Sequence, residues 1–481
     1  MSGIGSPPTL DTARHLRYWK RCFRTFLPHQ YTSNDSIRMT LGFFILAAID
    51  LLSPTSTPPA EQLVTPSDRR RLRDWVLECQ HPQGGFWGSP THAVPVDRAE
   101  TRAVAAGEAE ENPGAANIAA TSFALLLLAL LAEDGDAAGA YAGVDRVRTL
   151  RWLRRLQRED GSFGEVLMKL PAAAGDEDGR DGGRWVPAGG TDMRYCYLAA
   201  TIRWMLRGDV REGDEAWVED IDVDGLVAHI RRGQTYDGGV AESSQHESHA
   251  GYACCAIAAL ALLDRPSHKQ GTSFEDSEAL RRGIADHAAL TEWLASRQLM
   301  YLEHNPGKRD DIDGDDPENA NFAEPPSLTY LSLDESIRYI GFNGRCNKIA
   351  DTCYTWWVSG ALSILGHPVA VTSGPSRAFL IAQTQHVIGG FSKYPGGPPD
   401  VYHGYLGLAA LATMDGGEPA LKEFDATLCV SAETVRKIEE ARDSLLRAER
   451  AGRDPDGLVG KLLGMGQSMM GGRPEWLAAV V

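Results

Sequence analysis

One short phrase recurs along the chain: a helix-like segment that ends in Gln and is followed in most copies by a glycine-containing turn. It occurs at 75–88, 152–165, 229–242, 293–298 and 379–393. A more apolar segment of helical length follows each copy. Because a single helix pair cannot bury its apolar face, repeated pairs must stack on one another. This repeat constrains the fold more than any other feature of the sequence.

A further pair at the start of the chain, 13–27 and 36–52, brings the total to six. Six pairs can close a ring, with the apolar helices inside and the amphipathic helices outside. We therefore expect an all-α fold, an α/α (α6-α6) barrel. If the inner helices run parallel, their first residues meet at one mouth of the barrel. The unusual residues at these positions are Asn117, Arg194, His249, Asp351, Cys353 and His403.

The spacing between repeats is irregular, which indicates insertions in a single large domain. We predict a barrel domain over residues 14–446, with an N-terminal extension at 1–13 and a C-terminal extension at 447–481. The predicted insertions lie at about 98–114, 171–190 and 300–336. The sequence suggests no role for them.

The charge and the cysteine pattern exclude several classes of protein. A formal net charge of −17 argues against a protein that coats nucleic acid or binds an anionic membrane. The eight scattered cysteines favour reduced thiols, and the N-terminus lacks a secretory signal. The longest apolar stretch, 118–132, falls short of the roughly 20 residues that cross a bilayer. We expect a cytoplasmic protein without stable membrane insertion.

A mixed set of oxygen, sulfur and nitrogen ligands lies at two adjacent inner-helix starts. Asp351, Cys353 and His403 could bind zinc and leave its fourth position open, as in catalytic zinc sites. In the alternative interpretation, Asp351 is a helix cap, Cys353 a small core residue and His403 a core histidine. Spacing alone favours this alternative. Cys346, in the preceding turn, is a rival ligand.

Cations precede the same inner helix. Arg345 and Lys348, joined by His249 and Tyr354, could bind a phosphate or diphosphate together with helix N-terminal amides. The alternative is a pair of exposed cations in weak surface ion pairs. Aromatic and small residues near these helix starts would line an apolar interior, and without a ligand they are ordinary core: Tyr197, Tyr252, Cys255 and Trp357. An apolar interior beside a diphosphate site suggests an isoprenoid.

Four motifs decide between these alternatives: ESHAGYACC (247–255), GRCNKIADTCYTWW (344–357), GGFSKYP (389–395) and DVYHGY (400–405). With them the chain resembles the β subunits of protein prenyltransferases over roughly residues 14–415. The resemblance implies one zinc ion on Asp351, Cys353 and His403, and an αβ heterodimer with a helical-repeat α subunit. It implies prenyl diphosphate ligands at His249, Arg345, Lys348 and Tyr354. It also implies a lipid channel lined by Arg194, Tyr197, Tyr252, Cys255 and Trp357.

Two positions distinguish the branches of this family. Thr40 lies where the farnesyl enzyme has a Trp that shortens the channel, and Lys393 lies where that enzyme has an Asp that binds magnesium. Both are similar to the type I geranylgeranyl enzyme. The resemblance therefore implies transfer from geranylgeranyl diphosphate to C-terminal CaaX cysteines, with Leu or Phe as the last residue, and no need for Mg²⁺. Targets of this kind include Rho-type small GTPases.

Some features depart from that branch. Tyr402 is typical of the farnesyl enzyme, and Asn117 replaces a histidine expected in the peptide pocket. The β subunits of farnesyltransferase and of the Rab geranylgeranyltransferase therefore stay as alternatives. An α/α-barrel terpene cyclase would need an acidic protonation motif that the DGDD sequence at 313–316 does not match. A non-catalytic binding barrel would have no use for a zinc triad beside two cations.

Overall fold

The computed structural model describes residues 9–54, 62–90, 116–133, 135–169, 185–268, 274–300, 338–414 and 416–451. The predicted insertion at 98–114 and almost all of that at 300–336 lie outside these residues. So do the first part of the insertion at 171–190 and most of the predicted C-terminal extension.

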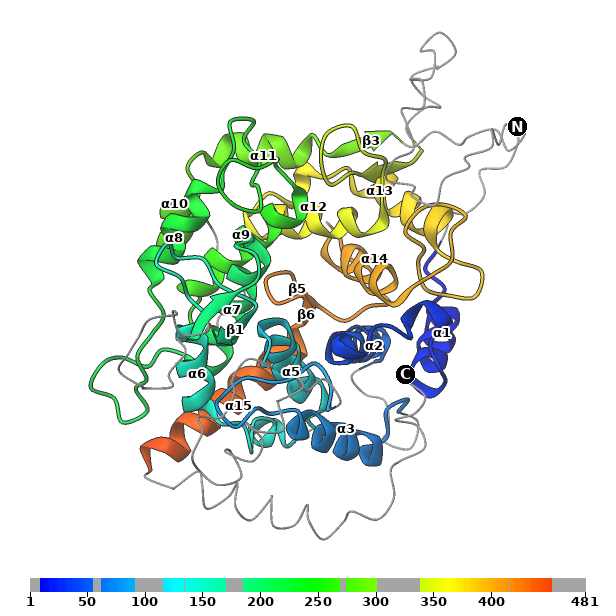
Figure 1. Ribbon diagram of the computed structural model, residues 1–481. Helices are drawn as coiled ribbons and strands as arrows, with labels where there is room; N and C mark the ends of the chain where they lie inside the picture. Colours follow the sequence, from blue (N-terminus) through cyan, green and yellow to red (C-terminus); the bar gives the residue numbers. More distant parts are fainter. Residues whose placement is uncertain are drawn as a thin grey trace, which may run out of the picture.

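Six helices form a closed inner ring (Figure 1). Each packs against the next in chain order, and the sixth packs against the first. Most of their residues are apolar, as expected for helices enclosed by other helices; in α9, every residue except Tyr252 is buried. The inner helices are α2 (Arg38–Leu52), α5 (Ile118–Leu131), α7 (Met193–Arg207), α9 (Ala250–Leu263), α12 (Thr352–Ile364) and α14 (Val401–Thr413).

Six helical segments surround this ring and precede the inner helices in the chain. They are α1 (Thr12–Arg24), α3 (Pro66–Glu78), α6 (Arg146–Arg155), α8 (Val223–Arg232), α11 (His287–Ala295) and α13 (Ser373–Ala378), the last continued by the π-helix η8 (Phe379–Thr384). Shorter helices lie in the connections: α10 (Glu278–Gly283), η1 (His29–Tyr31), η2 (Asp35–Ile37), η4 (Ala137–Gly139) and η7 (Pro368–Ala370). The predicted α/α barrel of six helix pairs is confirmed.

The recurring Gln joins five of the six outer helical segments to the next one. The side-chain amide of Gln157 donates to the Asp222 carbonyl at 2.8 Å, and its oxygen accepts from the Asp222 amide at 2.7 Å. Asp222 is the N-cap of α8. The same kind of link joins Gln80 to Gly143 and Asp145, Gln234 to Asp286, Gln298 to Ala370 and Thr372, and Gln385 to Asp11. The last of these closes the outer ring.

Backbone hydrogen bonds place the starts of the inner helices on one face of the ring. The amides of Ile118, Ala250 and Thr352 donate to the carbonyls of Glu165, Gly344 and Lys393. Each acceptor lies on the connection that leads into the next inner helix. The N-termini of the inner helices are therefore neighbours, as the parallel arrangement predicted. We call this face the mouth.

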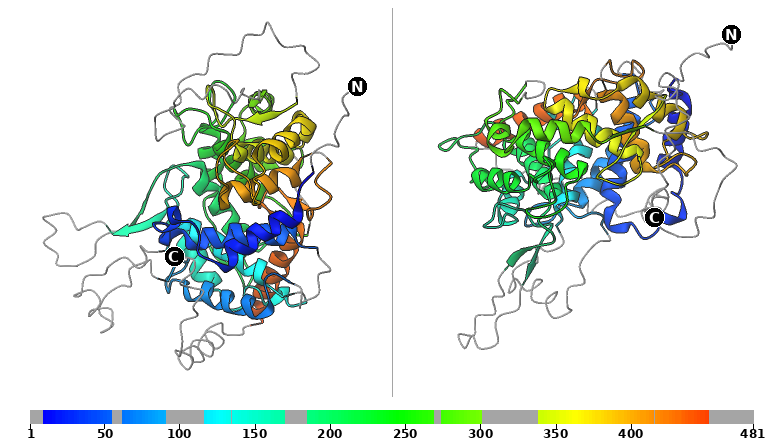
Figure 2. Two further views of the ribbon diagram at one scale, coloured as in Figure 1. Left: turned by 90° about the vertical axis from the view of Figure 1, so that its right-hand side faces the viewer. Right: turned by 90° about the horizontal axis from the view of Figure 1, so that it is seen from above.

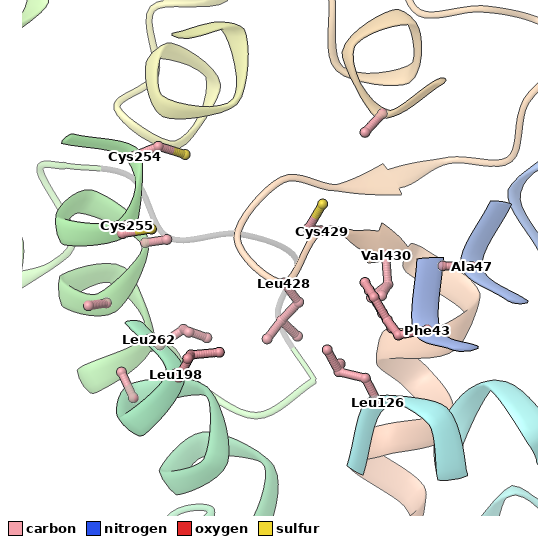
Figure 3. Packing of buried hydrophobic residues seen from close by; sticks show 14 of the residues in the cluster. Phe43, Ala47, Leu126, Leu198, Cys254, Cys255, Leu262, Leu428, Cys429 and Val430 are labelled. Atoms are coloured by element: carbon pink, nitrogen blue, oxygen red, sulfur yellow. The ribbon is translucent and has the colours of Figure 1, made fainter. Parts of the chain in front are cut away.

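The opposite face is closed by the last part of the described chain. Helix α15 (Ala432–Arg450) packs against α5 and α7 and runs past residue 446, where the C-terminal extension was predicted to begin. The hairpin of β5 (Phe424–Asp425) and β6 (Val430–Ser431) enters the ring, and Figure 3 shows its Leu428 and Cys429 between inner helices. The hydroxyls of Tyr197 and Tyr405 donate to carbonyls of this hairpin at 2.9 and 2.6 Å.

Two further antiparallel hairpins, which the sequence did not predict, belong to the connections. β1 (Val166–Lys169) pairs with β2 (Trp185–Ala188) and projects from the ring on the side opposite α15 (Figure 2). β3 (Gln298–Met300) pairs with β4 (Ile340–Phe342) directly before the turn that leads into α12. Within the described ranges, no helix combines the length and the apolar character needed to cross a bilayer.

Candidate metal and diphosphate site

Three potential metal ligands converge at the mouth, at the starts of two neighbouring inner helices. Asp351 is the N-cap of α12, Cys353 is the second residue of α12, and His403 is the third residue of α14. One ligand atom from each lies within 4.8 Å of the others. The Nε2 atom of His403 is 3.2 Å from Oδ1 of Asp351. All three side chains are largely buried, so they can hold a common ion away from bulk water.

The backbone at the start of α12 explains how two ligands only two positions apart converge. Asp351 has an extended conformation, with φ −140° and ψ 140°, and its carboxylate accepts from the Cys353 amide at 2.8 Å. Its own amide donates to the carbonyl of Phe342, the last residue of β4. Because Asp351 precedes the first helical residue, its side chain is free of the helical spacing that would separate it from Cys353.

Asp400 orients the imidazole of His403. Asp400 is the N-cap of α14, and its Oδ2 accepts from His403 Nδ1 at 2.7 Å. That bond assigns a proton to Nδ1 and directs Nε2 at the triad. Nε2 is buried and forms no well-aligned hydrogen bond with the described residues, but Oδ1 of Asp351 lies 3.2 Å from it. A histidine whose second nitrogen is held by a carboxylate is the usual arrangement at protein metal sites, so the residues fit a metal ion.

The electrostatics of the triad also fit a cation. Burial by itself would lower the pKa of His403, but the carboxylates of Asp351 and Asp400 outweigh it and raise that pKa to about 9. Burial, reinforced by the Asp351 carboxylate, raises the pKa of the Cys353 thiol well above its usual value. The protons on these groups compensate buried negative charge, a task that a divalent ion would take over. An Asp, Cys and His set suits zinc.

A cavity of about 580 Å³ adjoins the triad and carries most of the predicted cations. Its walls include His249, Arg345, Lys348, Tyr354 and Lys393 together with the three candidate metal ligands. An anion in this cavity would therefore lie beside the metal position. The predicted diphosphate ligands and the predicted metal ligands share one site.

The turn between β4 and α12 gives this wall its shape. A Cβ atom at Gly344 would lie 2.2 Å from Cζ of Tyr354, so only glycine leaves room for that ring. The Gly344 carbonyl accepts from the Ala250 amide at 2.8 Å, which ties the turn to the start of α9. The Tyr354 hydroxyl lies 3.0 Å from Nε2 of His249, whose Nδ1 accepts from the Gly251 amide at 3.1 Å. These contacts fix the two side chains against each other.

Lys393 connects the cations to the metal position. Its carbonyl accepts from the amide of Thr352, the first residue of α12, and its Nζ lies 3.9 Å from Oδ2 of Asp351. Lys393 therefore lies on the cavity wall next to a candidate metal ligand.

Comparison with known proteins identifies the family of the chain. The sequence model of the prenyltransferase alpha-alpha toroid domain matches residues 10–430. The chain belongs to the prenyltransferase alpha-alpha toroid family. It is 27% identical over 415 residues to the geranylgeranyl transferase type-1 subunit beta of Arabidopsis thaliana, covering 84% of each chain. It is 26% identical over 428 residues to the protein farnesyltransferase subunit beta of Pyricularia oryzae, covering 84% of this chain and 63% of that one.

The chain is also similar to a solved structure. Candida albicans protein geranylgeranyltransferase-I complexed with GGPP superposes with a TM-score of 0.63 and 25% sequence identity. The match covers 90% of the present chain and 99% of that chain.

The structure separates the predicted site residues of this toroid into two groups. The first group meets at the cavity: His249, Tyr252, Arg345, Lys348, Asp351, Cys353, Tyr354, Lys393 and His403. The second group lies elsewhere on the inner helices: Thr40, Arg194, Tyr197, Cys255 and Trp357. The rival ligand Cys346 is exposed and contacts Arg297, apart from the triad.

Members of the second group have individual partners. Arg194 pairs with Asp192 at 2.8 Å and lies over the ring of Tyr252. Tyr197 donates to the hairpin that closes the ring, and the Trp357 indole donates to the Tyr402 hydroxyl at 3.2 Å. Thr40 lies in the first turn of α2. Tyr252 and Tyr402 belong to the cavity wall, so Arg194 and Trp357 contact residues of that wall without lining the cavity themselves.

Sequence reasoning missed Asp400 and the carboxylates of Glu242 and Glu247 on the cavity wall. Asp400 had a recognisable signal, because it lies three residues before a candidate metal-binding His at a helix start. Glu247 lies two residues before His249, but nothing in the sequence indicates which way its side chain turns. Asn117, the predicted departure in the peptide pocket, donates to Glu165 at 2.8 Å, and Tyr195 donates to the same carboxylate.

Proposed function

We propose that this chain is the catalytic β subunit of a zinc-dependent protein geranylgeranyltransferase type I. The reaction moves a geranylgeranyl group from geranylgeranyl diphosphate to the cysteine of a C-terminal CaaX motif, with Leu or Phe as the last residue. One observation carries the proposal: the candidate metal triad and the cationic wall share a single cavity. A thiol must become a nucleophile at the place where a diphosphate becomes a leaving group.

On the acceptor side, Asp351, Cys353 and His403 would hold one zinc ion. Zinc held there would favour the thiolate of a target cysteine at neutral pH, since an unperturbed thiol titrates near 8.5. Asp400 keeps the His403 imidazole in the required orientation through its bond to Nδ1. The Asp351 carboxylate adds negative charge next to the sulfur position, which favours a nucleophilic acceptor.

On the donor side, the cavity wall stabilises the charge that develops on the departing diphosphate. Arg345 and Lys348 supply fixed positive charge from the turn before α12. His249 and Tyr354 supply polar groups from the starts of two inner helices. Lys393 supplies a cation where the farnesyl branch uses a magnesium-binding Asp, so Mg²⁺ is not required for the reaction.

The choice of lipid rests on the barrel interior and on the relatives. The apolar inner helices carry Tyr197, Tyr252, Cys255 and Trp357, with Arg194 near their starts, and Thr40 leaves room for four isoprene units. The type I geranylgeranyl relative from Arabidopsis thaliana and the geranylgeranyltransferase-I structure favour this donor. The farnesyltransferase β relative and Tyr402 keep farnesyl transfer as the second candidate.

The partners follow from the same proposal. The relatives are named as beta subunits, which supports a heterodimer with an α subunit. The acceptors would be cytoplasmic CaaX proteins such as Rho-type small GTPases. We assign the barrel domain to residues 14–446, with extensions at 1–13 and 447–481.

A transfer assay tests the proposal. The chain is co-expressed with an α subunit and offered each prenyl donor, with peptides ending in CaaX-Leu or in a double-cysteine tail. We expect geranylgeranyl transfer to the CaaX-Leu peptide, and transfer that persists when Mg²⁺ is chelated without removal of zinc. Preference for farnesyl diphosphate, or for the double-cysteine tail, would assign the chain to another branch. Strict dependence on Mg²⁺ would contradict the role of Lys393.

Substitution at residue 40 tests the argument from channel length. Thr40→Trp adds a large ring where the donor chain would lie, so donor preference should shift toward farnesyl diphosphate by about tenfold or more, as the longer lipid loses its space. Thr40→Ser is the matched control and should leave the preference unchanged. If the ratio of kcat/KM values for the two donors is the same in Thr40→Trp and the natural chain, Thr40 does not set the channel length.

A further inference from the structure

The wall of the cavity that faces the cations carries acidic side chains. The chain between the bridged residues Ala241 and Ser248 forms a short loop at the rim, with Glu242 and Glu247 on the cavity wall. Oε2 of Glu247 lies 2.6 Å from Nη1 of Arg345. One of the two cations of the turn before α12 is therefore bound to a carboxylate of the chain itself.

The two acidic residues differ in their partners. The Glu242 carboxylate lies 3.5 Å from Nε2 of His246 and accepts from the Tyr252 hydroxyl at 3.4 Å. Glu247, in contrast, forms its ion pair with a predicted diphosphate ligand. Of these two residues, Glu247 is therefore the one whose carboxylate can affect ligand binding by Arg345.

Because the Arg345–Glu247 ion pair is exposed, another anion can replace the Glu247 carboxylate. The side chains of Arg345 and Glu247 are 39% and 55% exposed. An ion pair this exposed contributes little to stability, because water and salt screen it. A diphosphate offers the guanidinium more negative charge and more acceptor oxygens than one carboxylate does. The carboxylate and the diphosphate would compete for the same N–H groups.

We propose that Glu247 is an internal competitor of the diphosphate. It occupies Arg345 while the cavity holds no diphosphate, leaves when the prenyl diphosphate binds, and returns as inorganic diphosphate departs. The carboxylate thereby lowers the affinity of the cavity for the diphosphate product and favours its release. This inference rests on the proposed function, because it takes the cavity to be a diphosphate site.

The test compares Glu247→Gln with a matched variant of an ion pair elsewhere. Glu247→Gln removes the charge and keeps the shape of a half-exposed side chain. The control is Glu133→Gln, which changes the net charge equally and lies just beyond the end of α5 at the closed face, 3.3 Å from Arg70 with 46% of its side chain exposed. Binding of inorganic diphosphate and of geranylgeranyl diphosphate is measured by calorimetry on the chain co-purified with its α subunit.

We expect Glu247→Gln to bind inorganic diphosphate about 2- to 5-fold more tightly than the natural chain, with Glu133→Gln unchanged. The gain should shrink at 1 M salt, where the Debye length is only about 3 Å. In an Arg345→Ala background the same substitution should give no gain, because the competition acts through the guanidinium.

Two results would overturn the inference. Equal or weaker diphosphate binding by Glu247→Gln would mean that the carboxylate positions Arg345 and does not compete with the ligand. If the gain persisted in the Arg345→Ala background, the effect of Glu247 would come from its negative charge near the mouth and not from competition for Arg345. If the natural chain bound neither inorganic diphosphate nor geranylgeranyl diphosphate, the proposed function itself would be wrong. That outcome differs from the two results above, because in both of them the natural chain binds diphosphate.

Discussion

The outer ring and the mouth of the barrel differ in how strictly the repeat keeps its residues: one position is constant in the outer ring, and one position varies at the mouth. In the outer ring, one residue type makes one kind of contact: Gln80, Gln157, Gln234, Gln298 and Gln385 each bind the backbone at or near the N-cap of the next outer helix. At the mouth, one position of the repeat carries different residues. The N-caps of five inner helices are Asn117, Asp192, His249, Asp351 and Asp400.

The difference shows where a repeat protein can vary its chemistry. Each of the five mouth residues accepts from a backbone amide of the first turn, and Asn, Asp and His can all do so. The fold is therefore satisfied by several side chains, and the atoms not used for capping are available for function. In four of the five links the Gln side chain both donates and accepts, so replacement of the residue loses part of the link.

We expect the largest effect on activity from replacement of the candidate metal ligands at the mouth. Cys353→Ala and His403→Ala should each abolish stoichiometric zinc binding and reduce transfer by at least about 100-fold, since loss of a ligand costs more than loss of its support. Cys346→Ala, at an exposed cysteine in the turn before α12, is the control and should keep zinc and activity. Full zinc occupancy in either ligand variant, by elemental analysis, would contradict the assignment.

The second prediction concerns the closure of the outer ring. His15 is fully buried between the last and first repeats, where Nε2 contacts Oε1 of Gln385 at 3.0 Å and Nδ1 accepts from the Gly390 amide. Burial lowers the pKa of His15 from 6.5 to about 4. Between these values the unfolded chain binds the proton and the folded chain does not. Stability therefore falls as pH drops from about 6.5 to about 4, by up to about 3 kcal/mol.

Urea unfolding at pH 7.5 and pH 4.5 measures this loss. Other groups titrate in the same window, so the prediction concerns the difference between the natural chain and His15→Gln. His15→Gln removes the titrating group, and its free energy of unfolding should fall by about 2–3 kcal/mol less over the same interval. Parallel losses in the two proteins would show that the ring closure does not respond to pH through His15.

The third prediction concerns Asp400, which both caps α14 and orients the candidate metal ligand His403. Asp400→Asn keeps an oxygen that can cap α14 but loses the charge that orients the His403 imidazole. Zinc affinity should fall about 10- to 100-fold, measured by competition with a chelator, while the thermal midpoint changes little. Asp222→Asn, at the N-cap of an outer helix, should leave zinc affinity unchanged. Equal zinc affinity in Asp400→Asn and the natural chain would refute the supporting role of Asp400.

The same contrast explains which features the sequence could predict. The ring followed from the repeat, because helix pairs that cannot bury their faces alone must stack. The triad was a candidate because Asp351, Cys353 and His403 lie at the starts of successive apolar helices. The closure of the face opposite the mouth was not predictable, because the hairpin of the short strands β5 and β6 has no hydrophobic periodicity. The direction of the Glu247 side chain depends on tertiary contacts that no local pattern encodes.

The role of the recurring Gln was likewise visible only in three dimensions. Its repetition marked the boundaries of the helices, but the partners lie far away in sequence, 65 residues for Gln157 and Asp222 and 374 residues for Gln385 and Asp11. A sequence pattern shows that a residue recurs, whereas the contact that it makes depends on how the ring closes.

The smallest expected effect tests that contact in one link of the outer ring. Gln157→Ala removes the donor to the Asp222 carbonyl at 2.8 Å and the acceptor of the Asp222 amide at 2.7 Å. The link is half-exposed, so water replaces part of both hydrogen bonds, and the free energy of unfolding should fall by about 1–2 kcal/mol with activity retained. Gln157→Glu keeps the acceptor but sets a carboxylate against a carbonyl oxygen, and should be no more stable than Gln157→Ala. Gln30→Ala, at an exposed Gln outside the repeat, should change stability by less than about 0.5 kcal/mol. If Gln157→Ala were as stable as Gln30→Ala, the recurring Gln would not hold the outer ring together, and the contrast with the variable mouth would lose its physical basis.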